Sequence, residues 1–400
     1  MNPLKETLAA QISEERIVRL TSNLVRIQSY CGIPQQETGV AKYIKAFFDA
    51  NGIPCELKEV EDGRCNVIAV FDSGRPGKTI LFNTHMDTVE PNDMKDAFEP
   101  KIVDGQLYGR GTVDPKGMLA CIMEAMTAIK NTGTLEKGKI VFTGVIDEEH
   151  NSAGTIDTLE SGIRADGAVI AESTDMQIQT CQRGLEWLKF HFVGKTVHGG
   201  MQRQGINAIS KAVAFINLMD EKLVPKIYAR THPLLKESTI NYAVIHGGTQ
   251  PSTVPGECDL LLDRRFLPYE DYEDVLGEFR SLLDELAEKD PEFKCEMSVC
   301  EESAMKGGYI HLPMEVAQDH PLVTTMQEAV RETTGEEPVM GFMPAWTDGG
   351  LLSAYGHIPT VIFGPRDGKT AHSAQEHVTV FDLPKTALVY AMTAVEFCRS

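Results

Sequence analysis

Short apolar segments alternate with helical patterns along the first half of this chain, and the alternation restricts the folds open to it. Three segments combine β-branched and apolar residues over the length of single strands: 65–71, 79–85 and 140–146. Three others place apolar residues at helical spacing: 13–30, 38–51 and 117–130. Strands that alternate with helices predict a layered α/β domain, with a mostly parallel mixed sheet and helices on both faces.

The pattern changes near residue 182. Residues 183–194 alternate with period two, and a helix, two strands, a helix and a strand are then predicted at 205–222, 239–248, 257–266, 270–289 and 293–299. This β-α-β-β-α-β order predicts a ferredoxin-like α+β domain. The first pattern resumes with a helix near 321–335, a strand at 360–364 and a last helix from 382. We therefore predict one domain made of residues 1–182 and 301–400, interrupted by an inserted domain at 183–300.

Composition excludes several classes of partner. The formal net charge is −20 and no basic run offsets it, which argues against nucleic acid or an anionic membrane as a partner. No apolar run approaches the roughly 18 residues of a membrane span, and the N-terminal segment lacks the apolar core of a signal peptide. The 9 cysteines are scattered, odd in number and without a C-x-x-C pair. We interpret them as reduced residues of a cytoplasmic protein.

Side chains able to bind a divalent metal ion follow apolar runs or Gly-rich turns at five places. They are His85 with Asp87, Asp114, the pair Glu148–Glu149, Glu172, and His372. Each has an ordinary alternative, because adjacent glutamates are normally solvated and an aspartate in a Gly-rich turn often serves turn geometry. Ligands of open α/β sheets gather at the carboxyl ends of strands. Five such places at predicted strand ends and loops favour one shared metal site.

Six motifs give nearly the whole chain a resemblance to a known family: THMDTV, GRGTVDPKG, DEEHNSAG, AEST, VHGGMQRQGINAI and TAHSAQEHV. They resemble those of the co-catalytic zinc amidohydrolases and peptidases, which include acetylornithine deacetylase, succinyl-diaminopimelate desuccinylase, aminoacylase-1 and bacterial glutamate carboxypeptidase. The resemblance implies a zinc-exopeptidase-like catalytic domain, with the insert at 183–300 serving as a lid or dimerisation domain. It also implies a homodimer formed through the insert.

The resemblance assigns the metal ligands. His85, Asp114 and Glu172 would hold one ion, while Glu149, His372 and the same Asp114 would hold the other. Two divalent ions per subunit are implied, zinc first, with cobalt or manganese as alternatives. Two ions about 3.5–4 Å apart lower the pKa of a bridging water and polarise a substrate carbonyl.

Further roles follow from the same resemblance. Asp87 would orient His85 by accepting the proton of its second ring nitrogen, an arrangement that fixes the tautomer. Glu148 would be the general base that activates the attacking water and passes the proton to the leaving amine. His198 would reach a neighbouring subunit's site and stabilise the tetrahedral oxyanion. Arg265 would hold a substrate carboxylate, for which a planar guanidinium is suited.

Further positions concern the backbone or the substrate. Gly364 would let the backbone approach the substrate. Ser173 and Ser252 are departures, since relatives often have Pro at the first position and many have Asn at the second, where it contacts substrate. The departure at Ser252 leaves the substrate open. The bond between Asp114 and Pro115 is predicted to be cis, as at this point in relatives, because proline lowers the cost of that form.

The predicted activity is hydrolysis of the amide bond of an N-acyl amino acid, of the deacetylase or desuccinylase type. A dipeptidase or carboxypeptidase acting on short peptides is the alternative within the same chemistry. A non-catalytic metal-binding homologue is disfavoured, because neither Glu148 nor His198 is needed merely to hold metal. A nucleotide-dependent oxidoreductase is disfavoured as well, because no G-x-G-x-x-G follows the early strands.

Overall fold

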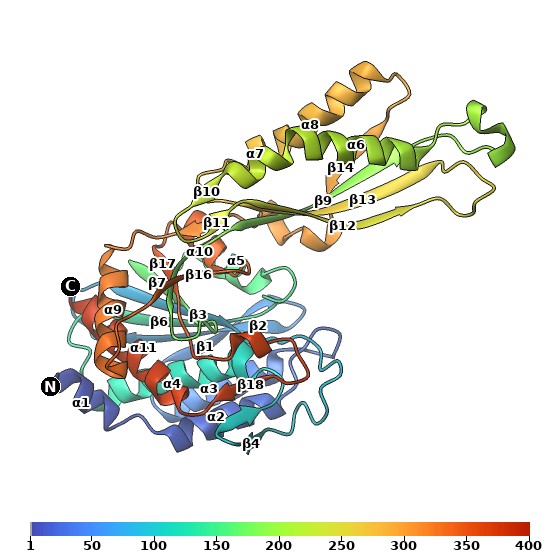
Figure 1. Ribbon diagram of the computed structural model, residues 1–400. Coiled ribbons are helices and arrows are strands. Elements are labelled where there is room, and N and C mark those ends of the chain that lie inside the picture. Colours follow the sequence, from blue (N-terminus) through green and yellow to red (C-terminus); the bar gives the residue numbers. More distant parts are fainter. Residues whose placement is uncertain (1) are drawn as a thin grey trace. The chain divides into compact units, whose positions relative to one another are not determined.

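The structure, a computed structural model, describes residues 2–400, which form two compact units (Figure 1). The first unit comprises the residues up to Cys181 together with Met314–Met343 and Thr347–Ser400. The second comprises Gln182–Pro313 and Pro344–Trp346. The first unit is therefore discontinuous in sequence, and the second extends further along the chain than residue 300, where the predicted insert ended.

A large mixed sheet forms the centre of the first unit. Its strands lie in the order β1 (Cys55–Glu61), β2 (Arg64–Asp72), β6 (Lys139–Val145), β3 (Thr79–His85), β7 (Gly167–Ile170), β17 (Thr360–Ile362), β8 (Ile178–Gln182) and β15 (Met314–Glu315), and β16 (Met340–Met343) pairs with β8. The central strands β6, β3, β7 and β17 are mutually parallel. The flanking strands β1, β2 and β8 are antiparallel to their neighbours. The predicted mixed α/β fold is confirmed, and its parallel part is this central group.

Helices cover both faces of this sheet (Figure 1). One face carries α1 (Pro3–Ala9), α2 (Glu14–Arg26), α3 (Thr38–Ala50), α4 (Gly117–Thr132), α9 (Pro321–Thr334) and α11 (Asp382–Arg399). The other face carries α5 (Ala153–Glu160) and α10 (Gly349–Ala354). The central strands are consequently buried on both sides, which explains why their sequences are nearly continuous apolar runs.

Aromatic side chains join the larger helix layer to the sheet. The rings of Phe48 on α3 and Phe142 on β6 lie 5.7 Å apart, and those of Phe82 on β3 and Tyr390 on α11 lie 5.4 Å apart. The buried Tyr390 hydroxyl donates a 2.6 Å hydrogen bond to the carbonyl of Phe363. Full burial of one such ring stabilises the fold by about 1.5–3 kcal/mol. These contacts fix the central strands whose carboxyl ends carry the site described below.

The second unit is a sheet covered by helices on one face (Figure 1). Its antiparallel strands lie in the order β12 (Thr239–Gly247), β13 (Glu257–Phe266), β9 (Gly184–Val193) and β14 (Cys295–Val299). The helices are α6 (Ala208–Lys222), α7 (Val224–Ala229) and α8 (Tyr272–Lys289). Burial alternates residue by residue along β13, as expected for a sheet with one covered face. The order of strands and helices agrees with the predicted ferredoxin-like arrangement.

Short elements complete the two units. A small sheet joins β18 (His377–Thr379), β5 (Gln106–Tyr108) and β4 (Lys101–Val103), while β10 (Thr231–His232) and β11 (Lys236–Glu237) form a hairpin in the second unit. Across residues 2–400, none of the helices combines the length and the apolar character needed to cross a bilayer.

Candidate metal centre

The predicted ligands come together at the carboxyl edge of the central parallel strands. His85 is the last residue of β3, and Glu149 lies in the turn that follows β6. Glu172 follows β7, and His372 lies on the loop that follows β17. Because these strands are parallel neighbours, their ends meet at one edge of the sheet, where ligands of open α/β sheets are found.

Asp114 enters this edge from a separate segment. It lies in η1 (Thr112–Lys116), directly before α4, and the bond between Asp114 and Pro115 is cis, as predicted. Its Oδ1 is 3.0 Å from Nε2 of His85, and its Oδ2 is 3.1 Å from Nε2 of His372. One carboxylate thus faces two separate imidazoles, one with each oxygen.

The remaining carboxylates complete two groups of candidate ligands around Asp114. Oε1 of Glu172 lies 3.3 Å from Nε2 of His85, and Oε1 of Glu149 lies 3.1 Å from Nε2 of His372. We call His85, Asp114 and Glu172 the His85 group, and Glu149, Asp114 and His372 the His372 group. Ligand atoms of His85, Asp114 and Glu149 all lie within 4.8 Å of one another. The two groups are those expected from the sequence.

Asp87 supports both the histidine and the turn after β6. Its Oδ1 is 3.2 Å from Nδ1 of His85, so the second ring nitrogen of this imidazole faces a carboxylate. Asp87 also accepts the backbone N–H groups of Glu148, at 3.3 Å, and of Glu149, at 3.0 Å. Burial raises the pKa of Asp87, but the hydrogen bond and charge of His85 together with the backbone hydrogen bonds outweigh burial and keep the pKa below its usual value. Asp87 therefore remains an acceptor for all three groups.

The electrostatics of the cluster favour bound positive charge. Hydrogen bonds with Asp114 and Glu149 raise the pKa of His372 to about 10. Burial opposes protonation of His85, but the charge of Glu172 and the neighbouring aspartates raise its pKa well above the usual value. Burial raises the pKa of Glu172 to about 7. The cluster contains more carboxylates than imidazoles. Its negative charge therefore stabilises a cation bound among these side chains.

Glu148 differs from the ligands around it. Burial is the main factor that raises its pKa, and the nearby carboxylates of Asp348, Glu172 and Glu149 raise it further, while His85 acts in the opposite direction. A glutamate with a raised pKa is suited to accept and return a proton near neutral pH.

Asp348 belongs to this neighbourhood and was not identified from the sequence. It is buried, its Oδ2 accepts a 2.6 Å hydrogen bond from the hydroxyl of Thr155, and burial raises its pKa to about 6. In the sequence it precedes Gly349 and Gly350, where an aspartate is the ordinary residue of a turn. Its only local signal was therefore indistinguishable from turn chemistry.

The residues present fit two divalent cations. Imidazole nitrogens and carboxylate oxygens are donors used by zinc and by manganese or cobalt in proteins. The His85 group and the His372 group each supply one imidazole and one carboxylate of their own, and both share Asp114. Shared carboxylates of this kind occur where two ions lie close together.

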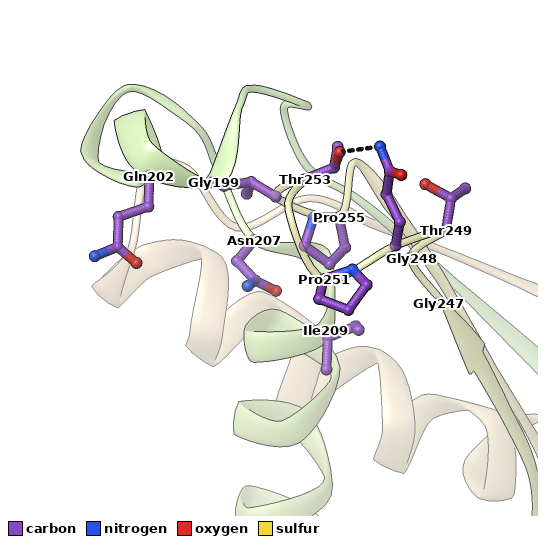
Figure 2. A pocket seen from close by; sticks show the side chains of 12 residues that line it. Gly199, Gln202, Asn207, Ile209, Gly247, Gly248, Thr249, Pro251, Thr253 and Pro255 are labelled. Atoms are coloured by element: carbon purple, nitrogen blue, oxygen red, sulfur yellow. Dashed lines mark hydrogen bonds between the residues drawn. The ribbon is translucent and has the colours of Figure 1, made fainter.

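His198 and Ser252 belong to the second unit and lie beside each other there. The backbone N–H of Gly199 donates a 2.7 Å hydrogen bond to the carbonyl of Ser252, and both His198 and Ser252 are exposed. Nδ1 of His198 accepts the N–H of Gly200 at 3.1 Å. An adjoining cavity of about 510 Å³ is lined by neighbours of both residues (Figure 2). Beside it, Gln250 Nε2 donates a 3.1 Å hydrogen bond to Thr253 Oγ1.

Arg265, also in the second unit, is already paired with a carboxylate. Its Nε and Nη2 lie 2.7 and 2.9 Å from the two oxygens of Asp263. Arg264 points to the opposite face, as predicted, where it is buried and pairs with Glu270 at 2.6 Å. A substrate carboxylate at Arg265 would therefore share the guanidinium with Asp263.

Gly364 is required by its contact with Glu172. A Cβ at this position would lie 2.2 Å from the carbonyl oxygen of Glu172 and 2.8 Å from its carbonyl carbon. The N–H of Gly364 also donates to the hydroxyl of Thr174 at 3.1 Å. The close approach that needs glycine here is thus made to the backbone of the predicted ligand Glu172, whereas the sequence suggested an approach to substrate.

This fold, with imidazoles and carboxylates gathered at one edge of its central sheet, is that of a class of metal-dependent hydrolases. Residues 81–396 match Peptidase family M20/M25/M40, and the chain belongs to this family. The family resemblance inferred from the motifs is confirmed, together with the class of metal-dependent amidohydrolase or peptidase.

Curated relatives match almost the whole chain. The chain is 28% identical to the N-formyl-4-amino-5-aminomethyl-2-methylpyrimidine deformylase of Bacillus subtilis (strain 168), over 96% of this chain and 95% of that protein. It is 25% identical to the "Probable succinyl-diaminopimelate desuccinylase" of Staphylococcus aureus (strain MSSA476), over 92% of this chain and 93% of that one.

Solved structures share the fold. Aminopeptidase PepT from Bacillus cereus ATCC 10987 has a TM-score of 0.81 at 23% identity, covering 97% of this chain and 100% of that one. A dinuclear metal binding peptidase of the M20 family from Bacillus subtilis has a TM-score of 0.71 at 16% identity, covering 96% and 98%.

Proposed function

We propose that the protein hydrolyses the amide bond of an N-acyl amino acid by means of two divalent metal ions held by the His85 group and the His372 group. The observation that carries this proposal is Asp114, whose two oxygens face two imidazoles at 3.0 and 3.1 Å. The curated relatives named a deformylase and a desuccinylase support removal of an acyl group from nitrogen. A peptidase acting on short peptides is the second candidate, favoured by the family to which the chain belongs.

The side chains divide the work of the reaction. The metal ions, when bound, would polarise the scissile carbonyl and acidify the attacking water. Glu148 would take the proton of that water on its carboxylate and deliver it to the leaving nitrogen. Asp87 would keep the proton of His85 on Nδ1, so that Nε2 remains free to bind metal. Zinc suits these donors first, with cobalt and manganese as alternatives.

Residues of the second unit would contribute to the site and to assembly. We assign His198 to the oxyanion in a neighbouring subunit's site, Arg265 to a substrate carboxylate and Ser252 to further substrate contact. The edge strand β12 exposes Val244 and Ile245 by 49% and 51%, which supports a homodimer formed through this unit. We also assign the protein to the cytoplasm, in keeping with its 9 scattered cysteines and their lack of a C-x-x-C pair.

A hydrolysis screen tests the proposal. Protein loaded separately with zinc, cobalt or manganese would be incubated with N-formyl, N-acetyl and N-succinyl amino acids, with dipeptides and with tripeptides, and released amine would be measured. Release from the N-acyl amino acids is expected. Release from the peptides alone would replace the acylase assignment by the peptidase, and no release from any substrate with both metal sites filled would overturn the hydrolase.

A further inference from the structure

The turn that holds Glu148 and Glu149 is bonded at three consecutive backbone N–H groups to two buried carboxylates. Asp87 accepts the N–H groups of Glu148 and Glu149, as described above. The N–H of the preceding residue, Asp147, donates instead to Oε1 of Glu37 at 3.2 Å. Glu37 lies directly before α3, far from any ligand in the sequence. The two carboxylates thus hold the same turn from different elements.

Arg64 on β2 connects Glu37 to the side chain of Asp147. Its Nε lies 2.8 Å from Oε2 of Glu37, and its Nη2 lies 2.6 Å from Oε1 of Glu37 and 3.0 Å from Oδ1 of Asp147. Glu37, Arg64 and Asp147 are 0%, 9% and 6% exposed. Charges this deeply buried need their partners, because an uncompensated buried charge is strongly destabilising. We call these three residues the Glu37–Arg64–Asp147 network.

The backbone of Asp147 has an unusual conformation beside the network. Its φ is +69°, in the left-handed region, which residues other than glycine adopt rarely and aspartate and asparagine more readily than most. Such conformations persist where surrounding contacts determine them, and they cluster at functional sites. Since this residue immediately precedes Glu148 and Glu149, its conformation contributes to the path of the turn that carries both side chains.

We propose that the Glu37–Arg64–Asp147 network positions the general base Glu148 and the ligand Glu149 without itself contacting metal or substrate. This inference rests on the proposed function, which gives Glu148 and Glu149 their roles. Loss of the network would let the turn relax, and small displacements of catalytic groups cost up to about 10²-fold in rate. Partners that orient metal ligands typically contribute 10–100-fold to metal affinity or activity.

Glu37→Ala and Asp147→Ala are the test variants, and Asp147→Asn is the conservative one. Asparagine keeps an oxygen for Arg64 and tolerates a positive φ, so Asp147→Asn should retain kcat close to that of the unchanged protein. Both alanine variants should lower kcat by about 10–100-fold with KM little changed. They should also bind the metal ion of the His372 group, which includes Glu149, more weakly. Metal content, kcat and KM would be measured on each variant.

Glu124→Ala is the matched control. Glu124 is also a buried carboxylate that accepts a backbone N–H, from Ser13 at 2.8 Å, and pairs with an arginine, Arg16, at 2.6 Å. The Glu124→Ala variant should have a lower unfolding temperature but unchanged kcat and metal content. The proposal is overturned if Glu37→Ala, like this control, leaves kcat and metal content unchanged. If Glu37→Ala does not fold, equal kcat values for Asp147→Ala and Asp147→Asn overturn it. Lack of activity in the unchanged protein would refute the proposed function instead, and metal content would still test the network.

Discussion

At the scale of single residues, Glu148 and Glu149 are chemically identical neighbours to which we assign different roles. Oε1 of Glu149 lies 3.1 Å from Nε2 of His372, within the His372 group. Glu148→Gln should therefore keep two metal ions bound and lower kcat by at least about 10²-fold, the scale of general-base catalysis. Glu149→Gln should lose one ion. Metal counting together with turnover measurements distinguishes the two roles, and equal metal loss in both variants would contradict the assignment.

A substitution at Gly364 would test whether the backbone position of Glu172, a proposed ligand, affects metal affinity. A Cβ would meet the carbonyl oxygen of Glu172 at 2.2 Å, so Gly364→Ala must displace the backbone of Glu172. We expect metal binding to weaken by about 10–100-fold, as when partners of metal ligands are lost. Titration with zinc under a competing chelator measures this effect.

The control for that variant is Gly277→Ala on α8. A Cβ there meets nothing within 4 Å, and alanine favours a helix over glycine by about 1 kcal/mol. Gly277→Ala should thus raise the unfolding temperature slightly and leave metal affinity unchanged. If Gly364→Ala binds metal as tightly as Gly277→Ala does, the contact with Glu172 has no role in the site.

At the scale of elements, the segment after β14 contains His311, whose protonation should lower the free energy of unfolding in acid. His311 is buried, its ring lies 4.5 Å from that of Trp346, and burial together with the charge of Arg265 lowers its pKa to about 4. The neutral ring is thus favoured in the folded state. The stability it contributes is complete above the unfolded pKa of 6.5 and is lost as the pH falls through about 4.

His311→Phe should remove this dependence. Phenylalanine keeps a ring against Trp346 but has no proton to gain, so up to about 3 kcal/mol of acid destabilisation should disappear between pH 6.5 and 4. Urea unfolding at a series of pH values measures it. The matched control is His246→Phe, at an exposed position of the same unit, which should retain the slope of the unchanged protein. Identical slopes in both variants would refute the role of His311.

Element boundaries were predictable where local pattern and burial coincide. The strands at 79–85 and 257–266 agree with β3 and β13, because continuous or alternating burial leaves a clear pattern in the sequence. The helix predicted from 205 begins instead at Ala208, where the side chain of Asn207 caps it by accepting the N–H of Ser210. The three-residue strands β4 and β5 are too short to show any periodicity, and they were missed.

At the scale of the whole molecule, the assembly and the activity are expected to depend on each other. If His198 acts on the site of a neighbouring subunit, neither Glu148→Gln nor His198→Ala can be active alone. A mixed dimer of the two variants contains one site that combines an intact Glu148 with an intact His198. Each mixed dimer should therefore have up to about half the specific activity of the unchanged dimer, because one of its two sites is intact under the two-fold symmetry common among oligomers.

The experiment needs proof that subunits exchange. Chains with different tags, mixed and purified in series, provide it and isolate the mixed dimer for assay. A mixed dimer without activity would place His198 within its own chain or outside the reaction. A protein that remains monomeric at all concentrations would exclude the proposed homodimer.

The sequence by itself determined the class of fold and named the side chains that we propose as ligands. Alternating apolar runs record which segments are strands and which helices, and polar side chains placed just after such runs lie at the strand ends, where ligands gather. His85, Asp114, Glu149, Glu172 and His372 are therefore identifiable from the sequence and its motifs, and the fold brings them together.

Only the tertiary structure decided which distant residues support those ligands. Glu37 accepts the N–H of Asp147 across 110 positions of sequence, and Thr155 donates to Asp348 across 193. Local pattern reports whether a residue is buried, but not which residue of another segment it meets. That pairing depends on the order of strands in the sheet and on the loops between them, which the packing of the whole chain determines.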